Sequence, residues 1–295
     1  MPITLETLMA QRQDAVPYAY TERDSMLYAL AIGMGRDPFN EVELDYVYER
    51  RGTLRTVPSQ AVVMARHNLI YDCGLQVPKM LHGEQLLTLH RSLPTEAALV
   101  ADHRVLNVFD HGPAKGILIE TESRVRLQDG TALFDIYNLY FARGDGGMGS
   151  SVGTPRAPYV MPQRPPDLVR VTQTEPRQAL LYRLTGDRNV IHADPKIARE
   201  MGFAGPILHG SCTLALACRE VLAGVCDYDP TRMRSFGTRF TSVVYPGERL
   251  ETDIWIDGEQ VSFRCRAPQR NAVVLDHGQC RLATPLFQTM QGDAP

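Results

Sequence analysis

The clearest hydrophobic pattern in the chain is the run SCTLALACREVLAG, which follows Gly210. The run is apolar on nearly all sides, and this predicts a buried helix rather than a surface helix. We expect the helix to end at Gly224, because glycine commonly terminates helices. An antiparallel sheet wrapped around such a helix is the simplest way to cover its apolar surface.

Strand-like runs follow this helix and also fill much of the first half of the chain. Val261, Phe263 and Cys265 alternate with polar residues, which is typical of a sheet with one buried face. Asp-Gly and Asp-His-Gly turn signals separate the runs. The predicted strands lie within residues 100–112, 115–130, 131–144, 235–247, 249–258, 260–268 and 272–284.

A stretch rich in glycine and then in proline, residues 144–166, divides the chain almost in half and is the best candidate linker. Each half contains a Leu-His-Gly tripeptide, at residues 81–83 and 208–210. We interpret this as a degenerate duplication, with an N-terminal unit over residues 1–145, a linker over 146–166 and a C-terminal unit over 167–295. The predicted fold class is α+β, with a helix wrapped by an antiparallel sheet in each half.

Composition excludes several classes of protein. The net charge of −3 comes without a run of like charge, so no basic surface for nucleic acid or an anionic membrane is expected. No stretch approaches the roughly 18–20 apolar residues of a membrane span, and the N-terminal residues lack a secretory pattern, so we expect a cytoplasmic protein. Six cysteines without a CxxC pair predict reduced thiols that pack in the core.

The run GDRNVIHADP gathers polar side chains on a segment too rich in turn formers to be a helix. Asp194 resembles a helix N-cap, and proline at the next position predicts a short helix over Pro195–Met201. Asp187 and His192 therefore flank a loop where a carboxylate and an imidazole can share one small volume. The alternative is purely structural: Asp187 and Asn189 are common turn residues, and His192 is then a satisfied loop histidine.

Two further features lie near this loop. His192, Asp194 and His209 form an alternative metal-ligand set, but no pair has the i, i+4 spacing of a helical zinc site, so we expect no metal. Gly210 precedes the buried helix, where a backbone N–H at the positive end of the helix dipole can hold an oxyanion. A glycine needed only for close packing is the alternative there.

Taken together, YRLTGDRNVIHADP (residues 182–195) and GPILHG (residues 205–210) resemble the signature of the MaoC-like, (R)-specific enoyl-CoA hydratase 2 family. Further stretches resemble the family in the same order, over nearly the whole chain: YALAIGMG, the Tyr48-Glu49 pair, MLHGEQ, FARGDGGMG and VYPGERL. The resemblance implies a double hotdog fold, in which each half wraps a long helix in an antiparallel sheet. It places the chemistry in the second half and most of the acyl tunnel in the first.

The resemblance also implies roles for single residues. Asp187 and His192 match the catalytic pair that activates water, Asn189 helps to fix that water, and the Gly210 N–H meets the thioester oxygen. Glu49 matches an acidic position that we expect near the domain interface, as a buried hydrogen-bond acceptor or a catalytic group. The supporting or substrate-binding residues are then Glu49, His209 and Ser211. The chain departs from the family where NVIH replaces the usual Asn-Pro-Leu-His and where Ser211 replaces an apolar residue, so the preferred chain length is open.

The expected function is reversible hydration of a trans-2-enoyl-CoA to a (3R)-3-hydroxyacyl-CoA, without a cofactor because CoA is part of the substrate. A hydratase of a specialised acyl-CoA, with a branched, dicarboxylic or steroid side-chain acyl group, is the alternative within this chemistry. A thioesterase and a non-catalytic acyl-CoA-binding protein are alternatives outside it. The resemblance favours a homodimer, with a monomer as the alternative, and no nucleic-acid or membrane partner is expected.

Overall fold

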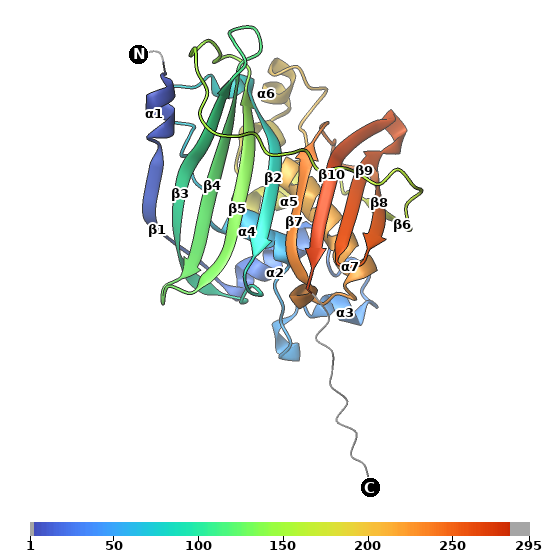
Figure 1. The fold of residues 1–295 in the computed structure, drawn as a ribbon. Coiled ribbons are helices and arrows are strands. Elements are labelled where there is room, and N and C mark those ends of the chain that lie inside the picture. The colour runs from blue at the N-terminus through green and yellow to red at the C-terminus, as the bar shows by residue number, and fades with distance from the viewer. Residues whose placement is uncertain (1–2, 284–295) are drawn as a thin grey trace.

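The structure, a computed structural model, describes residues 3–283 and is built on one ten-stranded antiparallel sheet (Figure 1). The strands follow one another across the sheet in the order β1-β3-β4-β5-β2-β7-β10-β9-β8-β6. Their bounds are Arg12–Tyr20 (β1), Met80–Leu89 (β2), Ala97–Asp110 (β3), Ile117–Leu127 (β4), Ala132–Ala142 (β5), Leu168–Gln173 (β6), Met233–Phe240 (β7), Arg249–Asp257 (β8), Gln260–Ala267 (β9) and Ala272–Leu282 (β10).

The strand order reveals the duplication. Read inward from its own edge, the first half has the order β1-β3-β4-β5-β2 and the second half has the equivalent order β6-β8-β9-β10-β7. The two halves join where β2 pairs with β7, with Leu86 opposite Gly237. A side chain at Gly237 would come within 2.6 Å of the Leu86 side chain, so glycine is required for this close approach. The α+β double hotdog architecture is confirmed.

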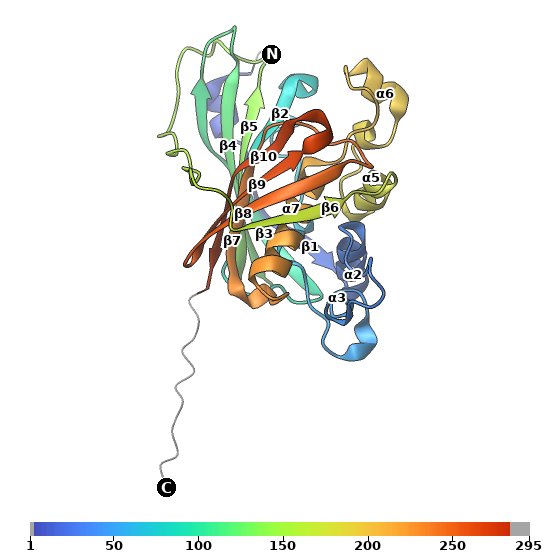
Figure 2. The ribbon, with the colours of Figure 1, turned by 90° about the vertical axis from the view of Figure 1, so that its right-hand side faces the viewer.

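The helices lie on one side of this curved sheet (Figure 2). The longest is α7, Gly210–Val225. The others are short: α1 (Leu5–Met9), α2 (Glu22–Ala31), α3 (Glu41–Leu44), α4 (Ala61–Met64), α5 (Gln178–Tyr182) and α6 (Pro195–Glu200), with 3-10 helices η1 (Glu49–Arg51), η2 (Pro58–Gln60), η3 (Val77–Lys79), η4 (Arg183–Thr185), η5 (Val190–His192), η6 (Pro230–Arg232) and η7 (Pro268–Arg270). None of the helices within residues 3–283 is long and apolar enough to cross a membrane.

The strands predicted from hydrophobic alternation are confirmed as β3–β5 and β7–β10, whereas β1, β2 and β6 were not predicted. The buried helix is also confirmed, but the expected stop at Gly224 is wrong. The helix continues to Val225, and the chain then turns through Asp227 and Tyr228, which adopt left-handed backbone conformations. The stop is therefore made by two residues with side chains, a conformation that sequence propensity does not favour.

The first Leu-His-Gly lies in strand β2, whereas the second lies at the start of α7. After Gly83 every second residue is buried, as the buried positions of Gln85, Leu87 and Leu89 show. After Gly210, residues 212–218 are all buried. The two halves thus share the tripeptide, but the burial pattern that follows it is that of a strand in the first half and that of a buried helix in the second. Within residues 3–142, α2, η2 and α4 take the place of the long helix implied by the resemblance.

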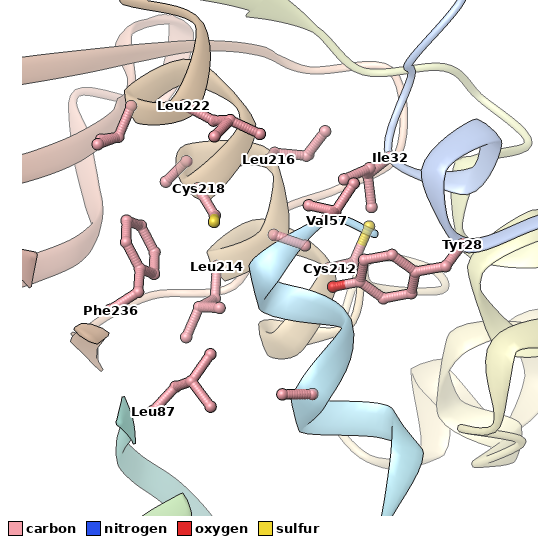
Figure 3. Close-up of a cluster of buried hydrophobic side chains, with 14 of the residues drawn as sticks. Tyr28, Ile32, Val57, Leu87, Cys212, Leu214, Leu216, Cys218, Leu222 and Phe236 are labelled. Carbon is pink, nitrogen blue, oxygen red and sulfur yellow. The ribbon is translucent and has the colours of Figure 1, made fainter. Parts of the chain in front are cut away.

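The core forms around α7, as Figure 3 shows. Eight of its residues are at most 2% exposed, among them Cys212, Leu214, Leu216, Cys218 and Leu222. They pack in one cluster with side chains of the first half, among them Tyr28, Val57 and Leu87. Both halves therefore share one hydrophobic core. All six cysteines are free and five of them are buried, which confirms that they pack rather than form disulfides.

The linker crosses from one half to the other along the sheet (Figure 1). Val152 forms an isolated β-bridge with Val108, and the Tyr159 hydroxyl lies 2.6 Å from the Ser262 hydroxyl. The glycine-rich start of the linker directs the N–H groups of Gly147 and Gly149 to the Asp110 carboxylate. These bonds hold the pKa of Asp110 below its usual value. The glycine N–H groups therefore bind the side-chain carboxylate of Asp110.

Candidate active site

The loop that carries the candidate residues is shaped by its own polar side chains. Gly186 has φ +136°, a conformation that favours glycine, at the start of the loop. The Asn189 side-chain Oδ1 accepts a 3.3 Å hydrogen bond from the Ile191 N–H and caps η5. Asp194 accepts a 2.8 Å bond from the Lys196 N–H and caps α6. The predicted helix is confirmed and ends at Glu200.

The Asp187 carboxylate is held from two sides. One oxygen accepts a 2.8 Å bond from the Arg66 guanidinium, and the other accepts a 3.2 Å bond from the Asn189 N–H. Burial alone would raise the pKa of Asp187, but Arg66 and the other groups around the carboxylate lower it below the ordinary value. Asp187 is therefore an ionised hydrogen-bond acceptor at neutral pH.

The His192 ring has a defined tautomer. Its Nδ1 lies 2.9 Å from the Ile207 carbonyl oxygen, and because a carbonyl can only accept, Nδ1 carries the proton. Nε2 is then left with a free lone pair. Burial lowers the pKa of His192, so the ring is neutral at pH 7. A neutral imidazole with an open Nε2 is able to take a proton from water.

His209 supports the loop from the helix side. Its Nε2–H donates a 3.0 Å bond to the Asp187 backbone carbonyl, and its ring stacks on the His192 ring with centroids 3.7 Å apart. Burial, together with His192, lowers the pKa of His209 to about 4. The Nδ1 atom of His209 is buried without a hydrogen-bond partner. His209 therefore fixes the position of both Asp187 and His192.

One ligand-type atom of each of Asp187, His192 and His209 lies within 4.8 Å of the other two. Asp194, which belonged to the metal set considered from the sequence, is an exposed helix cap and is not in this group. The two imidazole rings are stacked with centroids 3.7 Å apart and planes inclined by only 27°, so their nitrogen lone pairs lie in nearly parallel planes. A metal ion needs nitrogen lone pairs that converge at about 2.0–2.1 Å, which this stacking opposes. The arrangement suits a water molecule better than a metal ion.

Gly210 is the first residue of α7 and directly follows His209. As the first helical residue, it has an N–H without an intrahelical acceptor, and the residue is exposed. A side chain at this position would lie 3.2 Å from the Phe240 ring. Glycine therefore leaves a donor at the positive end of the helix open to a ligand.

The first half of the chain contributes an aromatic wall to this region. The His82 ring stacks on Tyr140 with centroids 4.8 Å apart, and it lies 4.9 Å from the Phe240 ring that faces Gly210. Neither this wall nor Arg66 was predicted from the sequence. His82 lies in the MLHGEQ stretch that carried the resemblance, whereas nothing in the sequence around Arg66 indicates its contact with Asp187.

The remaining predicted site residues, Ser211, Asn189 and Glu49, are all at least partly exposed. Ser211 is the second residue of α7 and is partly exposed, and Asn189 is exposed. Glu49 lies in η1 and is exposed, so its expected role as a buried acceptor is wrong. That role belongs to Glu43, which is 1% exposed and accepts bonds from the Gly35 N–H and from Arg219. Glu43 lies in α3, whose other face is open to solvent. A helix of four residues is too short to show a hydrophobic periodicity, so the sequence does not indicate that Glu43 is buried.

Comparison with known proteins shows the family to which the chain belongs. A MaoC-like domain model matches residues 159–276, and an MFE-2 hydratase 2 N-terminal domain model matches residues 18–144. The enoyl-CoA hydratase ChsH3 of Mycobacterium tuberculosis is 37% identical over 93% of this chain and 97% of its own length. The chain belongs to the MaoC-like hydratase 2 family. Another relative of this hydratase 2 chain, the peroxisomal enoyl-CoA hydratase 2 of Arabidopsis thaliana, is 35% identical over 92% of this chain and 93% of its own length.

Solved structures agree with the fold of this hydratase 2 family member. A MaoC-like dehydratase from Phytophthora capsici superposes with a TM-score of 0.85 at 29% identity and covers 96% of this chain and 99% of its own. A Mycobacterium tuberculosis protein described as having a double hotdog fold superposes with a TM-score of 0.54 at 13% identity, over 92% of this chain and 94% of its own. At 13% identity, the similarity to this second structure supports the fold but not the function.

Proposed function

We propose that this hydratase 2 family member adds water reversibly across the C2–C3 double bond of a trans-2-enoyl-CoA and forms a (3R)-3-hydroxyacyl-CoA. The observation that carries the proposal is the placement of ionised Asp187 and neutral His192 beside the start of α7. An acyl-CoA-binding protein has no need for an open imidazole nitrogen next to a held carboxylate. Several relatives are named as enoyl-CoA hydratases, and this supports the same chemistry here.

In the proposed reaction, Asp187 and His192 hold one water molecule between them. The carboxylate accepts one hydrogen bond from the water and orients it, and His192 Nε2 removes the other proton as the water oxygen bonds to C3. The resulting imidazolium then gives that proton to C2. Acid–base groups of this kind typically contribute about 10²–10⁴-fold to a rate.

Attack at C3 moves negative charge through C2 to the thioester oxygen. The Gly210 N–H, at the positive end of α7, is the donor proposed to stabilise this enolate. Because Asp187 stays ionised, its charge also favours formation of the His192 imidazolium. When the proton reaches C2, the thioester carbonyl is restored and the product keeps the bond to CoA. A thioesterase would instead break that bond and release free CoA thiol.

The test follows the loss of enoyl ultraviolet absorbance with trans-2-enoyl-CoAs of short, medium and branched chain. R- and S-specific dehydrogenases then report the configuration of the product. Asp187→Asn removes the carboxylate, and Asp194→Asn is the matched control because asparagine also caps helices. The expected result is an R product, lost in Asp187→Asn and kept in Asp194→Asn. Release of free CoA thiol, or equal activity of the two variants, would contradict the proposal.

A further inference from the structure

A pocket of about 570 Å³ opens beside the active site in the first half of the chain. It is lined by Gln13, Val16, Tyr18, Arg66, His67 and Asn68. Arg66 is shared, because its guanidinium also binds Asp187. The pocket is within the usual size range of ligand sites, but such sites are mostly apolar, whereas five of these six residues are polar. The inference below rests on the proposed function, since it concerns the acyl group of that substrate.

The Tyr18 hydroxyl donates to the Arg66 carbonyl and the Gln13 amide donates to Asn68, whereas His67 keeps a donor that is open to the pocket. The Leu69 N–H donates to His67 Nδ1, so the proton of the neutral His67 ring is on Nε2 and is left to donate. The His103 ring packs against His67 in a tilted arrangement, with centroids 4.2 Å apart. His103 is fixed in turn between the Tyr18 hydroxyl at 3.0 Å and the Ser123 hydroxyl at 2.7 Å. The polar wall is therefore preorganised.

The pocket carries little free charge. Burial is the main cause that lowers the pKa of His67 to about 3 and that of His103 to about 4, so both rings are neutral at pH 7. The charge of Arg66 is balanced by Asp187 at 2.8 Å. A neutral oxygen atom that accepts hydrogen bonds fits this wall better than a carboxylate, which would also lie near the negative Asp187.

Strand β1 is deformed at the rim of the pocket. Its pairing with β3 shifts between Gln13 and Val16, both of which line the pocket. Within this bulge Ala15 adopts φ 53°, and its N–H donates a 2.7 Å bond to Asp102. Bulges redirect side chains and are common next to active sites. The bulge thus places Gln13 and Val16 together on the pocket.

The order of groups sets the direction of the substrate. The oxyanion donor of Gly210 marks C1, Asp187 and His192 mark C3, and Arg66 extends from Asp187 to the pocket. Because the pocket adjoins Asp187 through Arg66 and lies in the half of the chain to which the resemblance assigns most of the acyl tunnel, we infer that it lies on the acyl side of the reacting carbons. We propose that it receives the distal part of the acyl chain and selects chains that carry a neutral oxygen function, a hydroxyl or a ketone, over plain hydrocarbon chains.

The test compares kcat/KM of the full chain for three substrates of equal length: trans-2-octenoyl-CoA, its 8-hydroxy derivative and its ω-carboxy counterpart. A site built to bind a hydroxyl rejects the analogue without it, so the hydroxy chain is expected to be favoured over the hydrocarbon chain by about tenfold or more. His67→Phe and Gln13→Leu, which lie outside the catalytic cluster, are expected to abolish that preference. Both variants are expected to hydrate trans-2-butenoyl-CoA, which lacks the distal atoms, within about twofold of the unmodified chain.

Equal kcat/KM for the hydroxy and hydrocarbon chains, or a preference that survives in both variants, would overturn the inference. A preference for the carboxy chain over the hydroxy chain would overturn the assignment to a neutral group. Calorimetric binding of 8-hydroxyoctanoyl-CoA and octanoyl-CoA measures the same preference without turnover. If no enoyl-CoA is hydrated but the hydroxy chain still binds more tightly, the proposed reaction fails and the pocket assignment stands.

Discussion

Arg66 donates a 2.8 Å hydrogen bond to Asp187, although the two residues are 121 positions apart and belong to different halves of the duplication. The second half supplies the candidate catalytic pair, and the first half supplies the positive charge that keeps its carboxylate ionised. The active site is therefore complete only when both halves are folded together.

This contact predicts a change in the pH dependence of activity. Asp187 must be ionised to orient water, so activity is lost as the pH falls through the pKa of Asp187. Arg66 lowers that pKa. In Arg66→Gln the pKa of Asp187 rises, and the acid limb of the kcat/KM profile is expected to move to higher pH. Activity is expected to be about 10- to 100-fold lower, because the carboxylate is misplaced.

Arg66→Lys keeps the charge and should recover part of both effects. Arg104→Gln, which removes an exposed ion pair with Glu122, is the control. An acid limb that does not move in Arg66→Gln would show that Arg66 has no influence on Asp187.

Two glycines of α7 allow stability and activity to be separated. A side chain at Gly210 would press on Phe240 at 3.2 Å, whereas one at Gly224 would meet Arg170 at an ordinary 3.5 Å. Gly224→Ala is expected to raise the free energy of unfolding by about 0.5–1 kcal/mol and to leave kcat unchanged, because alanine favours helix. Gly210→Ala is expected to lower kcat about tenfold or more, because the oxyanion position is obstructed. Urea unfolding and enoyl-CoA kinetics on both variants test this pair. Equal kcat in the two variants would remove Gly210 from the proposed oxyanion site.

The buried carboxylate of Glu43 is expected to be a determinant of stability. It accepts bonds from the Gly35 N–H at 2.8 Å and from Arg219 and Tyr228 at 3.1 Å. Glu43→Ala leaves these donors unpaired and should lower the free energy of unfolding by about 3 kcal/mol. Glu41→Ala, in the same short helix but exposed, should change it by no more than about 0.5 kcal/mol. Chemical denaturation measures both values, and similar losses would contradict the assignment.

Four histidines with lowered pKa values make stability depend on pH. Burial is the main cause that lowers the pKa of His67 to about 3 and those of His82, His103 and His209 to about 4. The unfolded chain, with histidine pKa values of about 6.5, binds more protons than the folded chain below that pH. The free energy of unfolding is therefore expected to fall as the pH is lowered from about 6.5 toward 5. Denaturation at several pH values gives the slope, which His103→Gln should reduce by the contribution of one proton, about 1.4 kcal/mol per pH unit. A slope unchanged by this substitution would show that His103 does not contribute.

The sequence by itself determined the elements that depend on local periodicity. All-round apolar character predicted α7, alternation predicted seven of the ten strands, and Asp194-Pro195 predicted the start of α6. It also placed Asp187, His192 and His209 near one another, because short loops and a shared signature connect them. Local steric and hydrogen-bond preferences are sufficient for such features.

Only the tertiary structure decided the features that depend on contacts distant in sequence. Strand β2, which was not predicted, forms at the first Leu-His-Gly because its position between β5 and β7 suits a period of two. Glu43 rather than Glu49 became the buried acid, since Arg219 of α7 lies beside it. Arg66 reached Asp187 through the packing of the two halves. No local pattern encodes these pairings, because their energies arise from burial and charge compensation between segments that meet only in the folded chain.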